Sequence, residues 1–479
     1  MSLKLALPKG WIQGYTAAFL ERAGFDYIGY AESSRSYRPQ SRAFPELFTK
    51  VLHEKDIAIQ VASGNYDLAI CGSDWTQELV VKYPSDDIVK VRDLGYGQRE
   101  LYLCTSRFSG LHSVEDVKSM PGPVRIVSEY PNLAEAFVLK LQLPNFRIFP
   151  VWGATDVYPP EHADLAIVSA ASEEELGAKD LIPIASILSG NAWLIANRNS
   201  LERKDLSSLL APFYKTNPRV KEEEEELTIS EIDSEDKFEF SLFPADVVSL
   251  ALADGHQQSH TVSFLKEAGF KVKGYRSPLP TRRPSPVFEG VNVKVVRPQD
   301  MPLQVANGNF DLAVTGRDWL TDQLYRFPSS PVEELLNLGF GQVRIVAVVH
   351  NDLPADSTSE LRELLQSGEI PVLRIASEYM HIADKYARDN HLSPYKVIPS
   401  WGATEAFLPE DADVLIENTE TGSTLKKNNL KIIETLFEST GCLIGNSNSL
   451  VDPIKKDRIG KLVKVFAKGL TESVPGVSG

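Results

Sequence analysis

The chain carries one stretch of sequence twice. Val61–Trp75 reads VASGNYDLAICGSDW and Val305–Trp319 reads VANGNFDLAVTGRDW, so ten of these fifteen positions are identical at a constant offset of 244. Further matches follow in the same order: Asp93–Gln98 with Asn337–Gln342, Ser128–Tyr130 with Ser377–Tyr379, and Trp152–Thr155 with Trp401–Thr404. The chain is therefore a tandem duplication, and its function must be sought where the two copies differ.

The length of the chain predicts a further division inside each copy. With 479 residues, of which 43% are hydrophobic, the chain can bury several cores. We predict a first repeat at residues 1–215, an acidic linker at 216–240 and a second repeat at 241–479. Because each repeat is large for a single core, we expect a second lobe to be inserted in each, at about 105–182 and about 350–431.

The linker prediction rests on Lys221–Asp236, which reads KEEEEELTISEIDSED and lies between the copies. A run of like charges repels itself and stays solvated. An interaction tail is the alternative interpretation of this segment.

Both copies begin with a short apolar run followed by a helix-like stretch that ends in Ala-Gly-Phe. The runs are Leu3–Leu7 and Val247–Leu252, and the endings are Ala23–Phe25 and Ala268–Phe270. Beyond them, short apolar runs alternate with longer amphipathic stretches, a pattern typical of parallel strands joined by crossover helices. The predicted fold class is α/β.

Charge and cysteine content exclude several classes of protein. Fifty basic and 65 acidic residues give a net charge of −15, which disfavours binding to nucleic acid or to an anionic membrane surface. No segment approaches the roughly 20 apolar residues that a membrane span needs. The three cysteines are widely spaced in apolar runs, and His256 and His260 have no third ligand nearby. We expect a cytoplasmic protein without a disulfide framework and without a metal site built from its own side chains.

A candidate anion site follows a strand in the second copy. The strand-like Ala412–Ile416 runs into Glu417–Leu425, which reads ENTETGSTL, and then into helix-compatible Lys426–Leu430. A turn between a strand and a helix start brings backbone N–H groups and hydroxyls together where the helix dipole is positive. The predicted phosphate-binding and sugar-binding residues are Glu417, Glu420, Thr421, Gly422, Ser423 and Thr424. Helix capping without a ligand is the alternative interpretation of this turn.

The first copy provides an internal control for this turn. Thr421–Thr424 is matched by Ser172–Glu175, in which three carboxylates replace the glycine and two hydroxyls. Three negative charges repel a phosphate, and no glycine remains for a close backbone approach. If phosphate is bound, only the second copy binds it.

Several motifs together resemble the ATP phosphoribosyltransferase family, whose members catalyse the first step of histidine biosynthesis. The motifs are Leu7–Gly10, Val296–Asp300, Thr315–Trp319, Leu338–Gly341, Arg374–Tyr379 and Glu417–Leu425. The resemblance covers both copies and nearly the whole chain apart from the linker. It implies a two-lobed α/β unit, similar to periplasmic binding proteins, that pairs as a dimer. It also implies transfer of phosphoribosyl from phosphoribosyl pyrophosphate to an adenine ring nitrogen of ATP, with Mg²⁺ present and pyrophosphate released.

The chain departs from the family pattern because each copy has lost different residues. The first copy keeps Lys9 and Arg35, where the second has Asp254 and Pro280. The second copy keeps Arg297, which the first replaces with His53, and Arg317, which the first replaces with Ser73. The resemblance therefore implies an intramolecular pseudo-dimer with one active site, completed by side chains of the degenerate copy.

Catalysis of this reaction depends mainly on charge stabilisation, because pyrophosphate leaves readily and the adenine nitrogen already carries a lone pair. We assign Arg35, Lys9 and Arg297 to the departing pyrophosphate. The resemblance also indicates an ATP-binding set, which consists of Thr315, Gly316, Arg317, Asp318, Glu378 and Tyr379. Glu129 and Tyr130 persist in the degenerate copy, which favours a partly structural role for this pair.

Two repeated features favour structure over binding. The glycines of Leu338–Gly341 are interpreted as a turn between lobes. Trp75, Trp152, Trp319 and Trp401 recur at equivalent positions, which favours packing over substrate stacking.

Other functions and partners remain open at this point. The alternative function is a non-catalytic regulatory or ligand-binding paralogue, which Asp254 and Pro280 favour. A solute-binding protein would need export, and the N-terminal sequence shows no signal segment. After Leu450 only one helix-like stretch is expected, at Pro453–Leu470, without the regulatory domain of the family's long form. A separate regulatory subunit, further self-association, and histidine sensing by the degenerate half are open alternatives.

Overall fold

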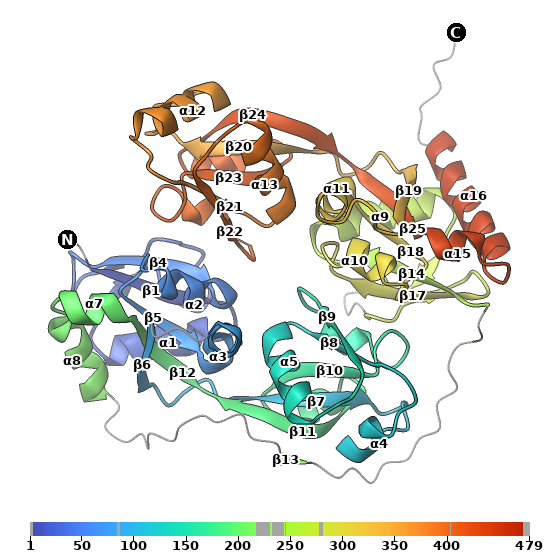
Figure 1. Cartoon of the computed structure of the whole chain (residues 1–479), viewed down its shortest axis with the longest axis horizontal. Helices are drawn as coiled ribbons and strands as arrows, with labels where there is room; N and C mark the ends of the chain where they lie inside the picture. Colours follow the sequence, from blue (N-terminus) through green and yellow to red (C-terminus); the bar gives the residue numbers. More distant parts are fainter. Residues whose placement is uncertain are drawn as a thin grey trace. The chain divides into compact units, whose positions relative to one another are not determined.

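The computed structural model describes residues 3–83, 87–216, 230–231, 244, 246–276, 281–402 and 404–472. Most of the predicted linker at 216–240, together with Leu279 and Pro280, lies outside these described residues. The chain divides into two compact units (Figure 1). The first comprises Met1–Pro150, Tyr158–Phe240 and Trp401–Ala406, and the second comprises Val151–Val157, Ser241–Ser400 and Phe407–Gly479.

The first lobe of the first unit is a five-stranded sheet whose first three strands are parallel. Its order is β4 (Phe48–His53), β1 (Lys4–Lys9), β5 (Leu68–Gly72), β12 (Ala192–Asn197) and β6 (Ile88–Asp93), and β12 runs antiparallel to both of its neighbours. A small hairpin pairs β2 (Tyr27–Ile28) with β3 (Gln40–Ser41). The helices are α1 (Gln13–Arg22), α2 (Glu54–Ala62), α3 (Ser73–Lys82), α7 (Arg198–Arg203) and α8 (Ser207–Thr216).

The second lobe of this unit contains the strands between β6 and β12, together with a short strand at Ser230–Glu231 that pairs with one of them. Its sheet order is β13 (Ser230–Glu231), β11 (Leu181–Gly190), β7 (Arg99–Ser106), β10 (Leu165–Ala170), β8 (Val124–Ser128) and β9 (Phe146–Pro150). Its helices are α4 (Val114–Lys118), α5 (Pro131–Lys140) and α6 (Glu173–Gly177). Apart from β13, the sheet of the inserted lobe extends from Arg99 to Gly190.

The first lobe of the second unit repeats the same sheet. Its order is β17 (Val291–Val296), β14 (Val248–Ala253), β18 (Leu312–Gly316), β25 (Gly441–Asn446) and β19 (Val332–Asn337), with β15 (Val272–Lys273) paired to β16 (Ser285–Pro286) in a separate hairpin. The helices around this sheet are α9 (His256–Glu267), α10 (Met301–Ala306), α11 (Arg317–Arg326), α15 (Ser447–Val451) and α16 (Lys456–Glu472) (Figure 1).

The second lobe of the second unit is also a repeat of its counterpart. Its order is β22 (Tyr395–Pro399), β21 (Leu373–Ser377), β23 (Val414–Thr419), β20 (Val343–His350) and β24 (Leu430–Ser439). Its helices are α12 (Thr358–Ser367), α13 (Met380–Asp389) and α14 (Ser423–Lys427). The short 3₁₀ helices η1 (Thr155–Val157) and η2 (Thr404–Phe407) follow β9 and β22. The prediction of an α/β fold with two tandem, two-lobed copies is confirmed.

Local sequence explains where these elements begin and end. The strand β14 consists almost entirely of buried apolar residues, as expected for a strand covered on both faces. In α12, the Ser357 hydroxyl accepts a hydrogen bond from the Glu360 amide at the N-terminus, and Gly368 ends the helix with a φ of 82°.

The two lobes of each unit are joined by paired crossing segments. In the second unit, the Leu338 amide donates to the Gly441 carbonyl over 2.8 Å, and the Gly441 amide donates to the Phe340 carbonyl over 2.8 Å. Gly339 and Gly341 have φ values of 69° and 61°, a region that favours glycine. The predicted turn between lobes is therefore confirmed at Leu338–Gly341.

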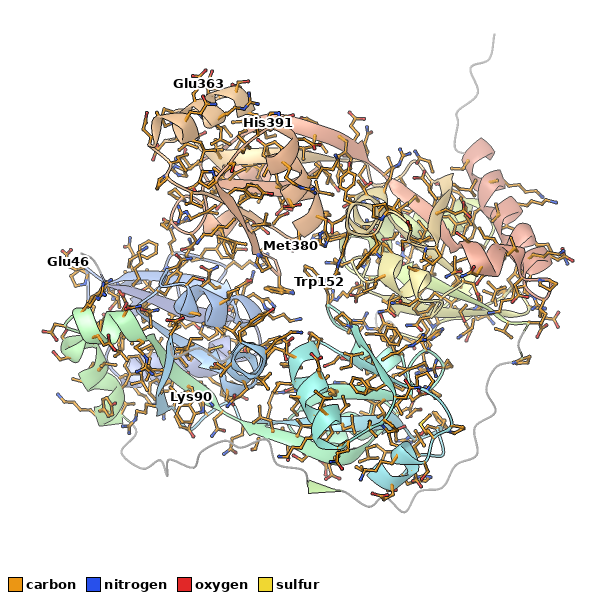
Figure 2. The ribbon with its side chains drawn as sticks, viewed as in Figure 1. Glu46, Lys90, Trp152, Glu363, Met380 and His391 are labelled. Carbon is orange, nitrogen blue, oxygen red and sulfur yellow. The ribbon has the colours of Figure 1, made fainter. Side chains whose placement is uncertain are left out.

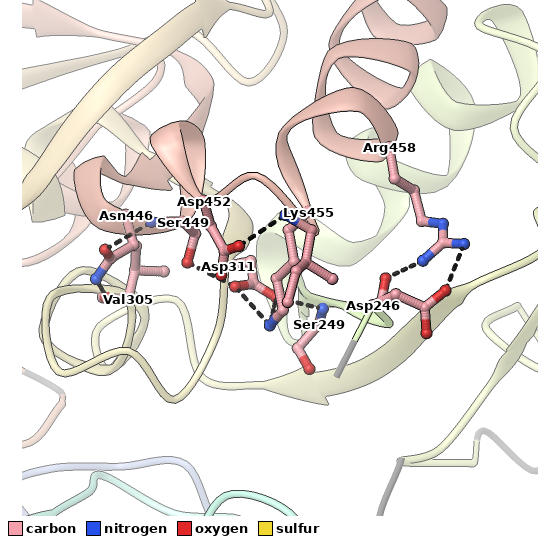
Figure 3. Close-up of polar contacts among 10 residues, drawn as sticks. Asp246, Ser249, Val305, Asp311, Asn446, Ser449, Asp452, Lys455 and Arg458 are labelled. Carbon is pink, nitrogen blue, oxygen red and sulfur yellow. Dashed lines mark hydrogen bonds and ion pairs between the residues drawn. The ribbon is translucent and has the colours of Figure 1, made fainter. Parts of the chain in front are cut away.

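A buried aspartate anchors the C-terminal part of each repeat. In the second unit, Asp311 accepts hydrogen bonds from the Ser249 amide (2.8 Å), the Ser449 hydroxyl (2.6 Å) and the Lys455 ammonium (2.9 Å), as Figure 3 shows. In the first unit, Asp67 accepts from the equivalent groups of Lys4 (2.9 Å), Ser200 (2.6 Å) and Lys204 (2.7 Å). The repeats share this structural network in full.

The recurring tryptophans pack against other aromatic rings. Trp319 lies 4.2 Å from Tyr379 between ring centroids, and Trp75 lies 4.2 Å from Tyr130. Within the second unit, Trp152 (labelled in Figure 2) meets Trp319 edge-on at 6.1 Å, and its amide donates to Asp300. These contacts support the packing interpretation for Trp75, Trp152 and Trp319. No helix in the described part of the chain combines the length and the apolar character that crossing a bilayer requires.

Candidate functional site

The predicted phosphate-binding turn joins β23 to α14. Gly422 has a φ of +73°, and a Cβ added there would meet no atom within 4 Å. The Gly422 amide donates to the Thr419 hydroxyl over 3.0 Å, and the Thr421 hydroxyl donates to that of Ser423 over 3.1 Å. The side chains of Glu420, Thr421, Ser423 and Thr424 are exposed. The turn therefore combines a glycine-dependent backbone with hydroxyls that face open space.

Glu417 precedes this turn on β23 and is half-buried. Its Oε1 accepts a hydrogen bond from the Asn418 amide over 2.9 Å. The Asn418 side-chain amide donates to the Tyr379 hydroxyl over 3.0 Å. The candidate sugar-binding segment is thus connected to a residue from the predicted ATP-binding set.

The first repeat fills the equivalent turn with its own carboxylate. Glu175 accepts hydrogen bonds from the Ala171 amide (3.0 Å), from Arg99 Nη2 (3.0 Å to each oxygen) and from Lys179 (3.1 Å). Partial burial opposes ionisation, but the Ala171 amide, Lys179 and Arg99 together lower the pKa of Glu175 to about 2. The negative charge that a phosphate would bring is already present there.

The two turns also differ in ways that the comparison of Ser172–Glu175 alone missed. α6 begins at Glu173, whereas α14 begins at Ser423, one aligned position later. The counterpart of Glu417 is the buried Val168, and that of Asn418 is Ser169, whose hydroxyl accepts from Arg99. Aligning the copies through Ser128–Tyr130 and Ser377–Tyr379, where the offset is 249, would have identified both substitutions.

Asp318 and Tyr379 from the predicted ATP-binding set bridge the two lobes of the second unit. The Tyr379 hydroxyl donates to Asp318 Oδ2 over 2.5 Å, and the Ser439 hydroxyl donates to Oδ1 over 2.8 Å. Both side chains are buried. Burial raises the pKa of Asp318, although the bonds from Tyr379 and Ser439 oppose this shift. The pair Asp74–Tyr130 repeats the bridge in the first unit over 2.7 Å.

The other members of that set divide into buried and accessible residues. The Thr315 hydroxyl is buried and donates to the Pro298 carbonyl over 2.9 Å. A Cβ at Gly316 would stand 2.1 Å from Asp318 Oδ1, so glycine is required for this close approach. Arg317 is half-exposed and pairs with Glu334 over 2.9 Å, and Glu378 is half-buried directly after β21.

The residues assigned to pyrophosphate lie on two different units. Lys9 ends β1, and its ammonium donates to the Tyr37 hydroxyl over 3.3 Å. Arg35 is exposed in the loop between β2 and β3. Arg297 directly follows β17 in the second unit and lies 3.4 Å from Asp254 between Nη1 and Oδ2. Asp254 also pairs with Arg282 over 2.6 Å, a residue that the sequence patterns did not single out.

His53 occupies the position of Arg297 in the first repeat. Burial lowers the pKa of His53 to about 4, and the positive charges of Lys55 and Lys9 lower it further in the same direction. The imidazole is therefore neutral near pH 7, so this position carries no cation in the first repeat.

Comparison with known proteins identifies close sequence relatives. The chain is 32% identical over 245 residues to the ATP phosphoribosyltransferase of Pelotomaculum thermopropionicum. This alignment covers 47% of this chain and 77% of that relative. It is 33% identical over 229 residues to the ATP phosphoribosyltransferase of Prosthecochloris aestuarii, covering 46% and 70% respectively.

Similar solved structures include an enzyme complex and a binding protein. The ATP phosphoribosyl transferase (HisG:HisZ) complex from Thermotoga maritima aligns with 18% identity and a TM-score of 0.38, covering 47% of this chain and 100% of that one. The periplasmic aliphatic sulphonate binding protein SsuA from Escherichia coli aligns with 11% identity and a TM-score of 0.30, covering 47% and 72%.

A family model described as ATP phosphoribosyltransferase matches residues 53–215 and 297–468. The two matched segments fall in the two repeats and together make up more than half of the chain. The chain therefore belongs to the ATP phosphoribosyltransferase family.

Proposed function

We propose that the protein transfers a phosphoribosyl group from phosphoribosyl pyrophosphate to an adenine ring nitrogen of ATP, using one active site in the second repeat. Family membership supports the general activity, because the family model and the curated relatives carry this description. The specific reaction and the use of a single site form the proposal.

One observation carries the choice of the second repeat. Its turn holds Gly422 in the left-handed conformation beside exposed hydroxyls, whereas the equivalent turn of the first repeat binds its own Glu175 carboxylate. Backbone amides and hydroxyls suit a phosphate group, and an internal carboxylate excludes one. The second repeat alone fits a phosphorylated sugar.

The proposed roles follow from where charge changes during the reaction. A bond forms between the adenine nitrogen and C1 of the ribose, while the bond from C1 to the pyrophosphate oxygen breaks. In this proposal Thr421–Thr424 binds the sugar phosphate and Glu417 binds the sugar hydroxyls. Arg297, Lys9 and Arg35 offset the charge that grows on the departing pyrophosphate.

Magnesium fits this scheme as an ion carried by the substrate. In the described ranges, no group of three or more His, Cys, Asp or Glu side chains is arranged to hold a metal ion. Mg²⁺ commonly binds through substrate phosphates with one or two carboxylates, and Glu417 and Glu420 supply oxygen ligands of that kind. When bound, the ion would neutralise part of the pyrophosphate charge.

The ATP-binding set remains part of the proposal with divided roles. Arg317 and Glu378 are accessible enough to contact a nucleotide. Thr315, Gly316, Asp318 and Tyr379 would act by shaping the segment between the lobes, since their polar groups are engaged inside the protein.

We also propose that the repeats act as an intramolecular pseudo-dimer in which Lys9 and Arg35 serve the second repeat. Self-association and a separate regulatory subunit are further partners to examine by measuring the mass of the particle in solution.

The decisive experiment mixes the purified protein with ATP, Mg²⁺ and phosphoribosyl pyrophosphate and follows pyrophosphate release and adenine absorbance. Product formation that requires all three components is expected. Binding of both substrates without product would favour a non-catalytic regulatory or ligand-binding paralogue, for which the pairing of Asp254 with Arg297 is the specific structural support.

A further inference from the structure

We infer that Arg282 joins Arg297 in a paired guanidinium site for the polyphosphate chain of a substrate, and that Asp254 is the residue that positions both arginines. This inference rests on the proposed function for the role of Arg297. Arg282 and Asp254 are the new assignments.

Strand topology brings the three residues together at one edge of the sheet. Asp254 directly follows β14, and its amide donates to the Val296 carbonyl over 3.2 Å. Arg297 directly follows β17, which is the parallel neighbour of β14. The Arg282 carbonyl accepts from the Val295 amide over 2.9 Å, which fixes this residue beside β17. Ligands of open α/β sheets bind at this carboxyl edge of parallel strands.

The ion pairs leave most of each guanidinium available. Arg282 Nη1 lies 2.6 Å from Asp254 Oδ2, and Arg297 Nη1 lies 3.4 Å from the same oxygen. The Asp254 side chain is 10% exposed, whereas those of Arg282 and Arg297 are 37% and 42% exposed. Across the described ranges, Asp254 is the only carboxylate paired with either arginine, and each uses Nη1 for that contact. Arg297 Nε lies against Gly153, where an added Cβ would stand 3.2 Å away. Nε and Nη2 of Arg282 and Nη2 of Arg297 can therefore donate to another anion.

The first repeat shows that this arrangement is peculiar to the second. The equivalent positions hold Lys9, Tyr37 and His53, and the equivalence of Tyr37 with Arg282 is fixed by the matching bond from the Val51 amide to the Tyr37 carbonyl. There, one ammonium faces a phenol and a neutral imidazole. The sequence predicts that Asp254 removes a cation, but the structure shows that Asp254 holds two.

The chemistry of two fork-shaped cations indicates the class of ligand. Guanidinium groups bind phosphate oxygens through two parallel N–H donors, so a pair of them suits adjacent phosphates better than a single carboxylate or sulfate. Pyrophosphate on the sugar donor and the triphosphate of ATP share this chemistry. Separate titrations and kinetics with each substrate can distinguish which of the two is bound.

The test is calorimetric titration of the full chain with inorganic pyrophosphate and with tripolyphosphate, without any requirement for turnover. Arg282→Tyr installs the residue of the first repeat, and we expect it to weaken pyrophosphate binding by about 10- to 100-fold. Arg282→Lys keeps the charge, loses the fork and should weaken binding less. Lys273→Ala removes a positive charge from the adjacent hairpin strand β15 and should leave binding unchanged.

Asp254→Asn separates positioning from simple charge. Removing a negative charge beside two arginines would tighten anion binding if electrostatics alone mattered. We expect weaker binding instead, because both guanidinium groups lose the carboxylate that fixes their orientation. Tighter binding by Asp254→Asn would overturn the positioning role, and unchanged binding by Arg282→Tyr and Arg282→Lys would overturn the paired site.

Kinetics and substrate titrations identify which substrate is held. Arg282→Tyr should raise the KM, and the Kd, of either phosphoribosyl pyrophosphate or ATP while changing kcat less. If the wild-type chain binds pyrophosphate but forms no product, the paired site stands and the proposed reaction fails. If the wild-type chain forms product but the Arg282 variants bind and react normally, the proposed reaction stands and the paired site fails.

Discussion

The two repeats share a frame but differ where strands end. Asp67 and Asp311 accept hydrogen bonds from the same three kinds of group, and Asp74–Tyr130 and Asp318–Tyr379 form the same bridge between lobes. At the turns after β10 and β23 the sequences instead place a bound carboxylate and a glycine in the left-handed conformation. The repeats therefore share the residues that connect the lobes and differ in the turns that the proposed function assigns to phosphate binding.

The differences are grouped by chemistry. The first repeat places Glu173–Glu175 in its turn and a neutral His53 at the strand edge. The second repeat has hydroxyls and Gly422 in the turn, and arginines at the edge. This turn and this strand edge are therefore better suited to an anion in the second repeat, whereas the first repeat retains Lys9 and Arg35.

The largest expected effect comes from giving the second turn the residue of the first. Gly422→Glu should lower kcat/KM by at least about 100-fold, because the carboxylate repels the sugar phosphate and strains a position with φ of +73°. Steady-state pyrophosphate release measures this loss.

Two further variants separate the causes. Gly422→Ala carries the backbone strain without the charge and should lose less activity. Glu173→Gly makes the reverse change in the first repeat and should keep wild-type turnover. A large loss in Glu173→Gly would show that the first turn takes part in the reaction.

The shared frame should respond equally in both repeats. Asp311→Ala leaves the Lys455 ammonium and the Ser249 amide without their acceptor, and Asp67→Ala does the same to Lys204 and Lys4. We expect each to lower the free energy of unfolding by about 2 kcal/mol. Denaturant titration measures this free energy. A much smaller decrease for one of the two variants would show that Asp67 and Asp311 do not stabilise their repeats equally.

Much of this comparison could be predicted from sequence, because the repeated motifs align the two copies, at an offset of 244 around Val61 and of 249 from Ser128 onward. The alternation of apolar runs with amphipathic stretches predicts the α/β class, and the glycines predict the turn at Leu338–Gly341. The alignment of the copies predicts the contrast between Gly422 and Glu173. It misses Arg282, because Asp254 meets it across a hairpin whose geometry no spacing encodes. Spacing also does not reveal that the Thr315 hydroxyl bonds to the Pro298 carbonyl. Nor does it reveal that Asp318 accepts hydrogen bonds from Tyr379 and Ser439.

Loss of one cation from the first repeat tests whether the repeats cooperate. Arg35→Ala should lower kcat on the order of tenfold if this exposed arginine serves the departing pyrophosphate. Arg42→Ala is the matched control, since Arg42 is also exposed and pairs only weakly with Asp26 at 3.6 Å. Equal activity in both variants would confine the reaction to the second repeat.

The smallest expected effect concerns a buried carboxyl that only the first repeat has. Glu54 begins α2 and is 4% exposed, and Pro298 takes its place in the second repeat. Burial, and next the nearby Asp74, raise the pKa of Glu54 well above 4.5, although Arg99 opposes the shift. The folded state therefore binds this proton more tightly than the unfolded state does. The stabilisation that protonated Glu54 contributes is complete below the pKa that Glu54 has in the unfolded state. This stabilisation declines as the pH rises towards the higher pKa of Glu54 in the folded state.

Glu54→Gln removes this titration while keeping the shape of the side chain. The variant should gain stability relative to the wild-type protein as the pH rises from 5 to 8, because the glutamine never has to carry a buried charge. Thermal unfolding across this pH range measures the difference. Glu46→Gln, at an exposed position labelled in Figure 2, changes the same chemistry without burial and should show no such trend. If the stability of the two variants changed with pH in the same way, Glu54 would titrate as a solvated group. The two repeats would then differ in sequence at this position but not in electrostatics.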